Sequence, residues 1–114
     1  MNDKDRVRLN HIQSSIADIE SFMINVSSEE FMKNRMFQNA VIRSFEIIGE
    51  AIQAISDELK SNHSEINWKD WKNFRNVLIH QYFGIDLKMI QFTILNELPE
   101  LKKSITSILE EENG

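Results

Sequence analysis

The chain has 114 residues, a formal net charge of −5 and no cysteine. This length allows one domain with a sizeable core, so residues 1–114 are treated as a single domain. The lack of cysteine excludes disulfide scaffolds, thiolate metal sites and cysteine nucleophiles. One proline and three glycines are too few for a turn-rich β protein. The acidic balance argues against a broadly basic nucleic-acid-binding surface, and we expect no DNA partner.

The N-terminal residues 1–6 are charged, and no apolar segment follows them that could act as a signal peptide. No apolar run approaches the roughly 18 residues that a membrane helix requires. We therefore expect a cytoplasmic protein with no membrane partner. The absence of thiols agrees with this, because a reducing cytosol does not support disulfides.

The first long segment, from about Asp3 to Asn25, has apolar residues at helical spacing. They are Leu9, Ile12, Ile16, Ile19, Met23 and Val26. This pattern predicts a helix with a narrow seam for packing on its neighbours. Ser27 to Glu30 then has the Ser-x-x-Glu pattern of a capping box, which predicts the start of a second helix.

The second helical pattern reaches about Leu59, either unbroken or with a break near Lys33 and Asn34. Its apolar face comprises Phe37, Val41, Phe45, Ile48, Ile52, Ile55 and Leu59. The polar residues 60–64 have no periodicity and predict a loop.

Asn67 is placed to cap a helix that runs from Trp68 to Phe83. Its inward side chains are predicted to be Trp68, Trp71, Phe74 and Leu78. Gly84 is predicted to end this helix in the left-handed conformation, and Asp86 to cap the last helix.

Pro99 lies inside the last helical pattern and is predicted to kink or split it near Glu97. The helical patterns together predict an all-α fold, an up-down bundle of four to five helices.

Three polar side chains, those of Arg75, His80 and Tyr82, interrupt the otherwise apolar helix from Trp68 onward. Polar groups that are buried or half-buried cost free energy unless something uses them. Asn76 and His80 are four residues apart and share a face, whereas Arg75 lies about 140° around the helix from His80. The long Arg75 side chain can bend toward the imidazole or toward a second copy of the helix. This segment therefore indicates a functional site.

Arg and His without a carboxylate cluster or metal ligands suit phosphoryl transfer on RNA. Histidine moves protons near neutral pH, arginine holds a phosphate through several N–H donors, and the RNA 2′-hydroxyl is the nucleophile. Lys72 and Asn76 are the predicted supporting or substrate-binding residues. Cleavage is helped by both a base and an acid, but the motif has one histidine. A homodimer with two such helices face to face would supply two.

The spacing of Arg75, His80 and Tyr82 closely resembles the motif of the HEPN-domain toxins of the HepT family. The likeness includes residues 41–51, which end in Ile-Gly-Glu-Ala, and residues 83–86 after the motif. The resemblance implies a HEPN-like homodimer and a metal-independent endoribonuclease, the toxin of a toxin–antitoxin pair. It implies Arg75 and His80 as the catalytic pair, with no cofactor and no metal ligand.

The resemblance also implies a role for Tyr82 and a second protein partner. In the family, this tyrosine receives AMP from a nucleotidyltransferase antitoxin of the MntA type, which uses ATP as donor. The added phosphate would place bulk and negative charge beside the RNA site and block it.

An alternative hypothesis comes from a different class of function. The bundle would be a non-catalytic interaction module or regulatory subunit for a nucleotidyltransferase, with Arg75 and His80 serving only the interface. The simplest structural interpretations also stay open at this point. They are a surface salt bridge for Arg75, a hydrogen-bonded core side chain for His80 and a packed ring for Tyr82.

Overall fold

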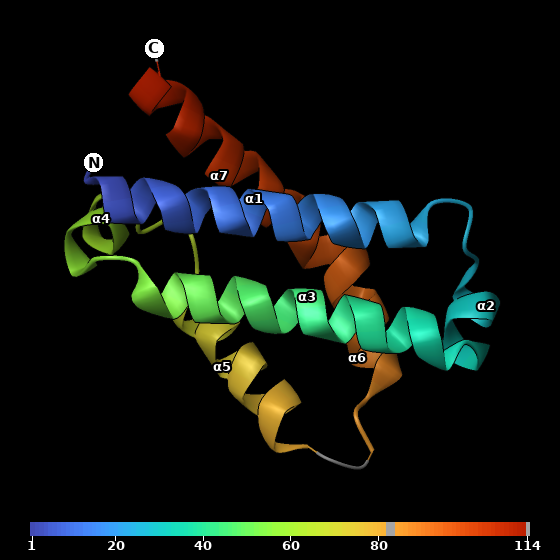
Figure 1. The fold of residues 1–114 in the computed structure, drawn as a ribbon. Coiled ribbons are helices and arrows are strands. Elements are labelled where there is room, and N and C mark those ends of the chain that lie inside the picture. Colours follow the sequence, from blue (N-terminus) through green and yellow to red (C-terminus); the bar gives the residue numbers. More distant parts are fainter. Residues whose placement is uncertain (82–83, 114) are drawn as a thin grey trace.

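The computed structural model describes residues 1–81 and 84–113, and within these ranges the chain forms helices and no strand. The elements are α1 (Asp3–Met23), α2 (Ser28–Lys33), α3 (Arg35–Ala54), α4 (Asp57–Asn62), α5 (Trp68–His80), α6 (Leu87–Phe92), a π-helical segment η1 (Thr93–Glu97) and α7 (Leu98–Asn113). The long helices α1 and α3 lie side by side and antiparallel, α5 packs on α3, and α7 packs on α1 (Figure 1). The predicted all-α up-down bundle is confirmed.

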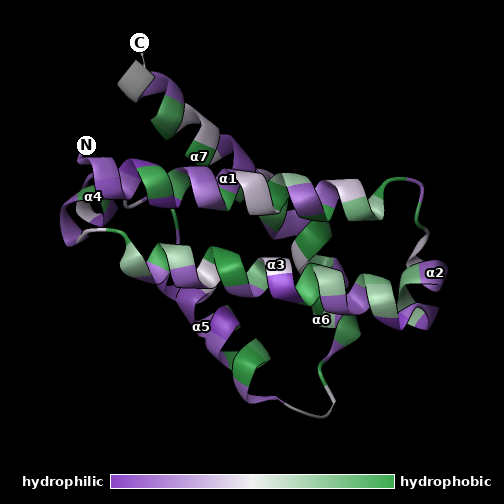
Figure 2. Cartoon of the chain, viewed as in Figure 1, coloured by the Kyte–Doolittle hydropathy of each residue, from purple (hydrophilic) through white to green (hydrophobic). Residues whose placement is uncertain are grey.

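The core lies between α1, α3 and α7. In α1, the predicted seam residues Leu9, Ile12, Ile16 and Ile19 are at most 1% exposed, whereas the last seam residues are only partly buried. Hydrophobic and hydrophilic bands alternate along the long helices (Figure 2), as amphipathic helices require. None of the described helices is long and apolar enough to cross a membrane.

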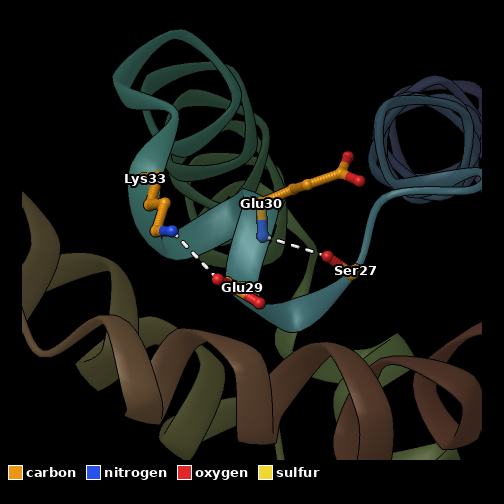
Figure 3. Close-up of polar contacts among 4 residues, drawn as sticks. All are labelled: Ser27, Glu29, Glu30 and Lys33. Atoms are coloured by element: carbon orange, nitrogen blue, oxygen red, sulfur yellow. Dashed lines mark hydrogen bonds and ion pairs between the residues drawn. The ribbon is translucent and has the colours of Figure 1, made fainter.

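The predicted capping signal at Ser27 starts α2. The Ser27 Oγ accepts a hydrogen bond from the Glu30 backbone N–H at 3.0 Å, while the Glu30 carboxylate extends away from Ser27 (Figure 3). Only the serine half of the capping box is therefore formed. Of the two alternatives left open near Lys33 and Asn34, the structure shows the break, because Asn34 Oδ1 accepts from the Phe37 N–H at 3.1 Å and caps α3.

The prediction that α3 continues to Leu59 is wrong, since α3 ends at Ala54. The buried Asp5 carboxylate, 3% exposed, accepts hydrogen bonds from Ser56 N–H at 2.9 Å and Ser56 Oγ at 2.6 Å. Ser56 in turn caps α4, which covers most of the predicted loop at residues 60–64. The sequence pattern near Ser56 shows no break because the group that stabilises it lies in α1.

The prediction that α5 extends to Phe83 and ends at Gly84 is also wrong, because α5 ends at His80. Leu78 is the last buried residue of α5. Gly84 does adopt the predicted left-handed conformation, with φ of 77°, but it lies in the connection to α6. The prediction that Asp86 caps the next helix is confirmed.

Pro99 is accommodated by a change in helix type. The preceding segment η1 is a π-helix, in which the Leu98 N–H bonds to the Thr93 carbonyl. A proline in a regular α-helix would bring its ring against the carbonyl four residues earlier, here that of Leu95. The wider π turn relieves this contact, so the predicted interruption near Glu97 takes the form of a π segment between α6 and α7.

Helices α3 and α5 come into close contact at Gly49. A Cβ atom placed on Gly49 would lie 2.2 Å from the Cβ and 2.6 Å from the Cγ of Arg75. Such distances are far inside van der Waals contact. A glycine is therefore required at this point of α3 for α5 to pack where it does.

We predict that Gly49→Ala lowers the free energy of unfolding by about 1–3 kcal/mol, because the added methyl group overpacks the contact with Arg75. The loss exceeds the gain of up to about 1 kcal/mol that alanine normally brings to a helix. Urea denaturation followed by circular dichroism measures the change.

Arg75→Gly provides the matched background for this experiment, since it removes both atoms that the new methyl group would meet. In that background, Gly49→Ala is expected to be neutral or stabilising. The same loss of stability in both backgrounds would contradict the proposed contact.

Candidate active site on helix α5

Helix α5 is held on α3 by aromatic packing. The Phe45 ring lies 5.2 Å from the Phe74 ring and 6.1 Å from the Trp71 ring, measured between centroids. The indole N–H of Trp68 also donates to the His63 carbonyl at 2.9 Å. These contacts fix which side of α5 faces α3 and leave the opposite side outward.

Four polar residues share the outward side of α5. Lys69, Asn73, Asn76 and His80 lie within about 60° of one another around the helix axis. Asn76 is half-buried, and the other three are exposed. We call this set the polar ridge. Sequence reasoning identified the Asn76 and His80 members but missed Lys69 and Asn73, although their three- and four-residue spacing carried the signal.

Arg75 connects the contact with α3 to the polar ridge. Its stem lies against Gly49, and its Nη1 donates to Asn76 Oδ1 at 3.2 Å. The guanidinium therefore bends toward the side that carries His80, as the length of the side chain allowed. No hydrogen bond joins Arg75 directly to His80 within the described residues.

The Arg75 Nε atom is buried and donates to no partner in the described part of the chain. A buried N–H donor without an acceptor costs free energy that an incoming acceptor would recover. The half-buried guanidinium can therefore bind an anion through Nε and its remaining N–H groups. The interpretation of Arg75 as a surface salt bridge finds no support, because no ion pair of Arg75 is present among the described residues.

His80 is the last residue of α5, and its side chain is exposed. The interpretation as a hydrogen-bonded core histidine is therefore wrong. Lys72, the other predicted supporting residue, is exposed one turn before Asn76. The predicted modification site, Tyr82, lies outside the described residues.

The described residues contain no group of three or more His, Asp or Glu side chains that could hold a metal ion. The glutamate that follows Gly49 contacts a neighbour on its own helix, since Arg43 Nη1 lies 3.4 Å from Glu50 Oε1. The groups available for chemistry on this side of α5 are therefore a guanidinium, an imidazole, two amides and two ammonium groups.

Comparison with known proteins gives relatives across nearly the whole chain. A "Putative RNase" of Caldanaerobacter subterraneus subsp. tengcongensis is 38% identical over 94% of this chain and 96% of its own length. A "Probable ribonuclease HepT" of Thermococcus cleftensis is 39% identical over 82% of this chain and 86% of its own. No solved structure matches.

A third relative is a longer protein. The "Gamma-glutamylcyclotransferase and putative RNase" of Methanocaldococcus jannaschii is 38% identical over 93% of this chain, but the chain spans only 48% of that relative. The family described as "Ribonuclease HepT-like" matches residues 12–108, which include α3, α5 and the polar ridge. The chain belongs to the HepT-like ribonuclease family.

Proposed function

We propose that the protein is a toxin-type endoribonuclease that cleaves RNA without a metal ion. The observation that carries this proposal is the Arg75 guanidinium. Its buried Nε donates to no residue that the structure describes, and its Nη1 donates to Asn76 of the polar ridge that carries His80. Membership of the HepT-like ribonuclease family supports RNA as the substrate.

The chemistry follows from the groups on α5. His80 takes the proton of an RNA 2′-hydroxyl, and the 2′-oxygen attacks the adjacent phosphorus. The 2′-O–P bond forms as the P–O5′ bond breaks, which leaves a 2′,3′-cyclic phosphate and a free 5′-hydroxyl. Arg75 binds the non-bridging oxygens and stabilises the charge that develops on them. Lys72 and Asn76 help to hold the RNA backbone.

A homodimer is the proposed active unit, because the leaving 5′-oxygen needs a proton and α5 carries one histidine. The second copy would supply that proton from its own His80. Two features support this arrangement. The polar ridge faces outward, and α5 packs mainly on α3, so the ridge side of α5 is turned toward a possible partner copy (Figure 1).

Silencing by AMP transfer is the last part of the proposal. Tyr82 is the only tyrosine of the chain and lies two residues beyond His80. Its hydroxyl would attack the α-phosphate of ATP on an MntA-type nucleotidyltransferase antitoxin and release pyrophosphate. The AMP would then bring a negative phosphate close to the site where Arg75 binds RNA.

We predict that the purified protein cleaves labelled RNA in EDTA and that His80→Ala lowers the rate by about 100-fold to 10,000-fold. His11→Ala is the matched control, because His11 is an exposed histidine on α1 and should leave the rate unchanged. Equal cleavage by wild type and His80→Ala would contradict the assignment. No cleavage by any of the three, with Tyr82 free of AMP by mass spectrometry, would favour the non-catalytic interaction module.

A mixing experiment tests the shared site. A mixed dimer of one wild-type and one His80→Ala protomer keeps two arginines but only one histidine. Because the proposed reaction takes its base and its acid from different copies, this mixed dimer is expected to cleave at least about 100-fold more slowly than the wild-type dimer. A mixed dimer that native mass spectrometry shows to have formed, and that keeps about half of the wild-type rate, would contradict the two-copy site.

We also predict that Tyr82→Phe cleaves RNA at the wild-type rate but resists silencing. Incubation with the nucleotidyltransferase and ATP should add AMP to the wild type and abolish its cleavage. The variant should gain no AMP and keep its activity, as measured by mass spectrometry and RNA cleavage in parallel. AMP on Tyr82→Phe would place the modification on another residue.

A further inference from the structure

A groove with a volume of about 870 Å³ lies between the start of α5 and the η1–α7 segment. Asp70 and Trp71 line it from α5, Phe92 lies at the end of α6, and Glu97 and Glu100 line the opposite side. Asp70 lies about 80° around α5 from His80, so the groove and the polar ridge occupy adjacent flanks of the helix. The proposed ribonuclease chemistry uses none of these groove residues.

The groove has an exposed apolar mouth. Phe92, which lines the groove at the end of α6, is 57% exposed. Inside, Trp71 and Leu101 are buried and form apolar walls. A large aromatic side chain left in water at the opening of a groove with apolar walls is typical of a surface that binds another protein.

The charge of the groove indicates what kind of partner it can bind. Four carboxylates line it, those of Glu65, Asp70, Glu97 and Glu100, against the single ammonium of Lys103. This negative field repels the phosphates of RNA. It also disfavours a symmetric contact with a second copy centred on the groove, because such a contact would place carboxylates opposite carboxylates. A partner with arginine or lysine side chains is favoured.

We propose that this groove binds an amphipathic helix of another protein, with apolar side chains flanked by arginines or lysines. The apolar side chains would pack against Phe92 and the walls formed by Trp71 and Leu101, and an arginine could stack on the exposed Phe92 ring. The flanking cations would pair with Asp70, Glu97 and Glu100. This proposal does not depend on the ribonuclease activity, because it uses the other flank of α5.

The probe for this proposal is a fluorescein-labelled amphipathic peptide in which leucine repeats every three or four residues and arginine flanks the leucine stripe. The expected result is saturable binding by fluorescence anisotropy, with NMR amide shifts concentrated at Asp70, Phe92, Glu97 and Glu100. A twin peptide with glutamate in place of arginine should not bind. Phe92→Ala and the double variant Glu97→Lys/Glu100→Lys should each weaken binding by roughly tenfold or more.

Two controls separate the groove from its surroundings. Asp18→Lys changes the charge of an exposed residue on α1 that does not line the groove, and it should leave peptide binding unchanged. His80→Ala should also leave peptide binding unchanged, whatever it does to RNA cleavage.

Four results would overturn the proposal. The first is no saturable binding by the folded wild-type protein, and the second is equal binding of the arginine and glutamate peptides. The third is binding that survives both groove variants. The fourth is a shift of the monomer–dimer equilibrium by Phe92→Ala in analytical ultracentrifugation, which would assign the groove to a second copy of this chain.

Discussion

At the crossing of α3 and α5, the backbone of Gly49 lies against the Cβ and Cγ of Arg75, and no side chain of α3 can enter this space. This one contact sets the distance between the two helices. It also fixes the stem of Arg75, so that the guanidinium reaches Asn76 and leaves Nε buried, with no acceptor among the residues that the structure describes. A binding group held from its stem loses less conformational freedom when an anion arrives.

Helix α5 carries two differently charged surfaces on adjacent flanks. Its polar ridge carries Lys69 and His80 and suits a negatively charged ligand, whereas the groove beside Asp70 is lined by carboxylates. The overall charge of −5 conceals this division, because none of the four residues of the polar ridge is acidic. An acidic body with a small positive region favours brief contact with RNA over long-lived, nonspecific binding.

The sequence predicted the features that depend on neighbouring residues. The α1 seam, the Ser27 cap and the Asp86 cap rest on local spacing and are confirmed, and the break at Asn34 is one of two alternatives that local spacing left open. The end of α3 was missed because Asp5, more than 50 residues away, caps that turn through Ser56. For the site, helical spacing placed Asn76 and His80 on one face. The contact of Arg75 with Gly49 depends on how two helices cross, which periodicity does not encode, and the role of Tyr82 stays a prediction.

The π-helical segment changes how α7 is rotated about the helix axis relative to α6. One residue corresponds to about 100° of rotation in an α-helix, so a turn with an extra residue rotates everything before it relative to everything after it. The segment ends just before Pro99, whose ring a regular α-helix would not tolerate there. Phe92 lies about two turns before Pro99. The π-helical segment that accommodates Pro99 therefore also determines the direction in which the Phe92 side chain points relative to α7. A homologous helix with neither the proline nor the extra residue would present a different side chain at the same position on its surface.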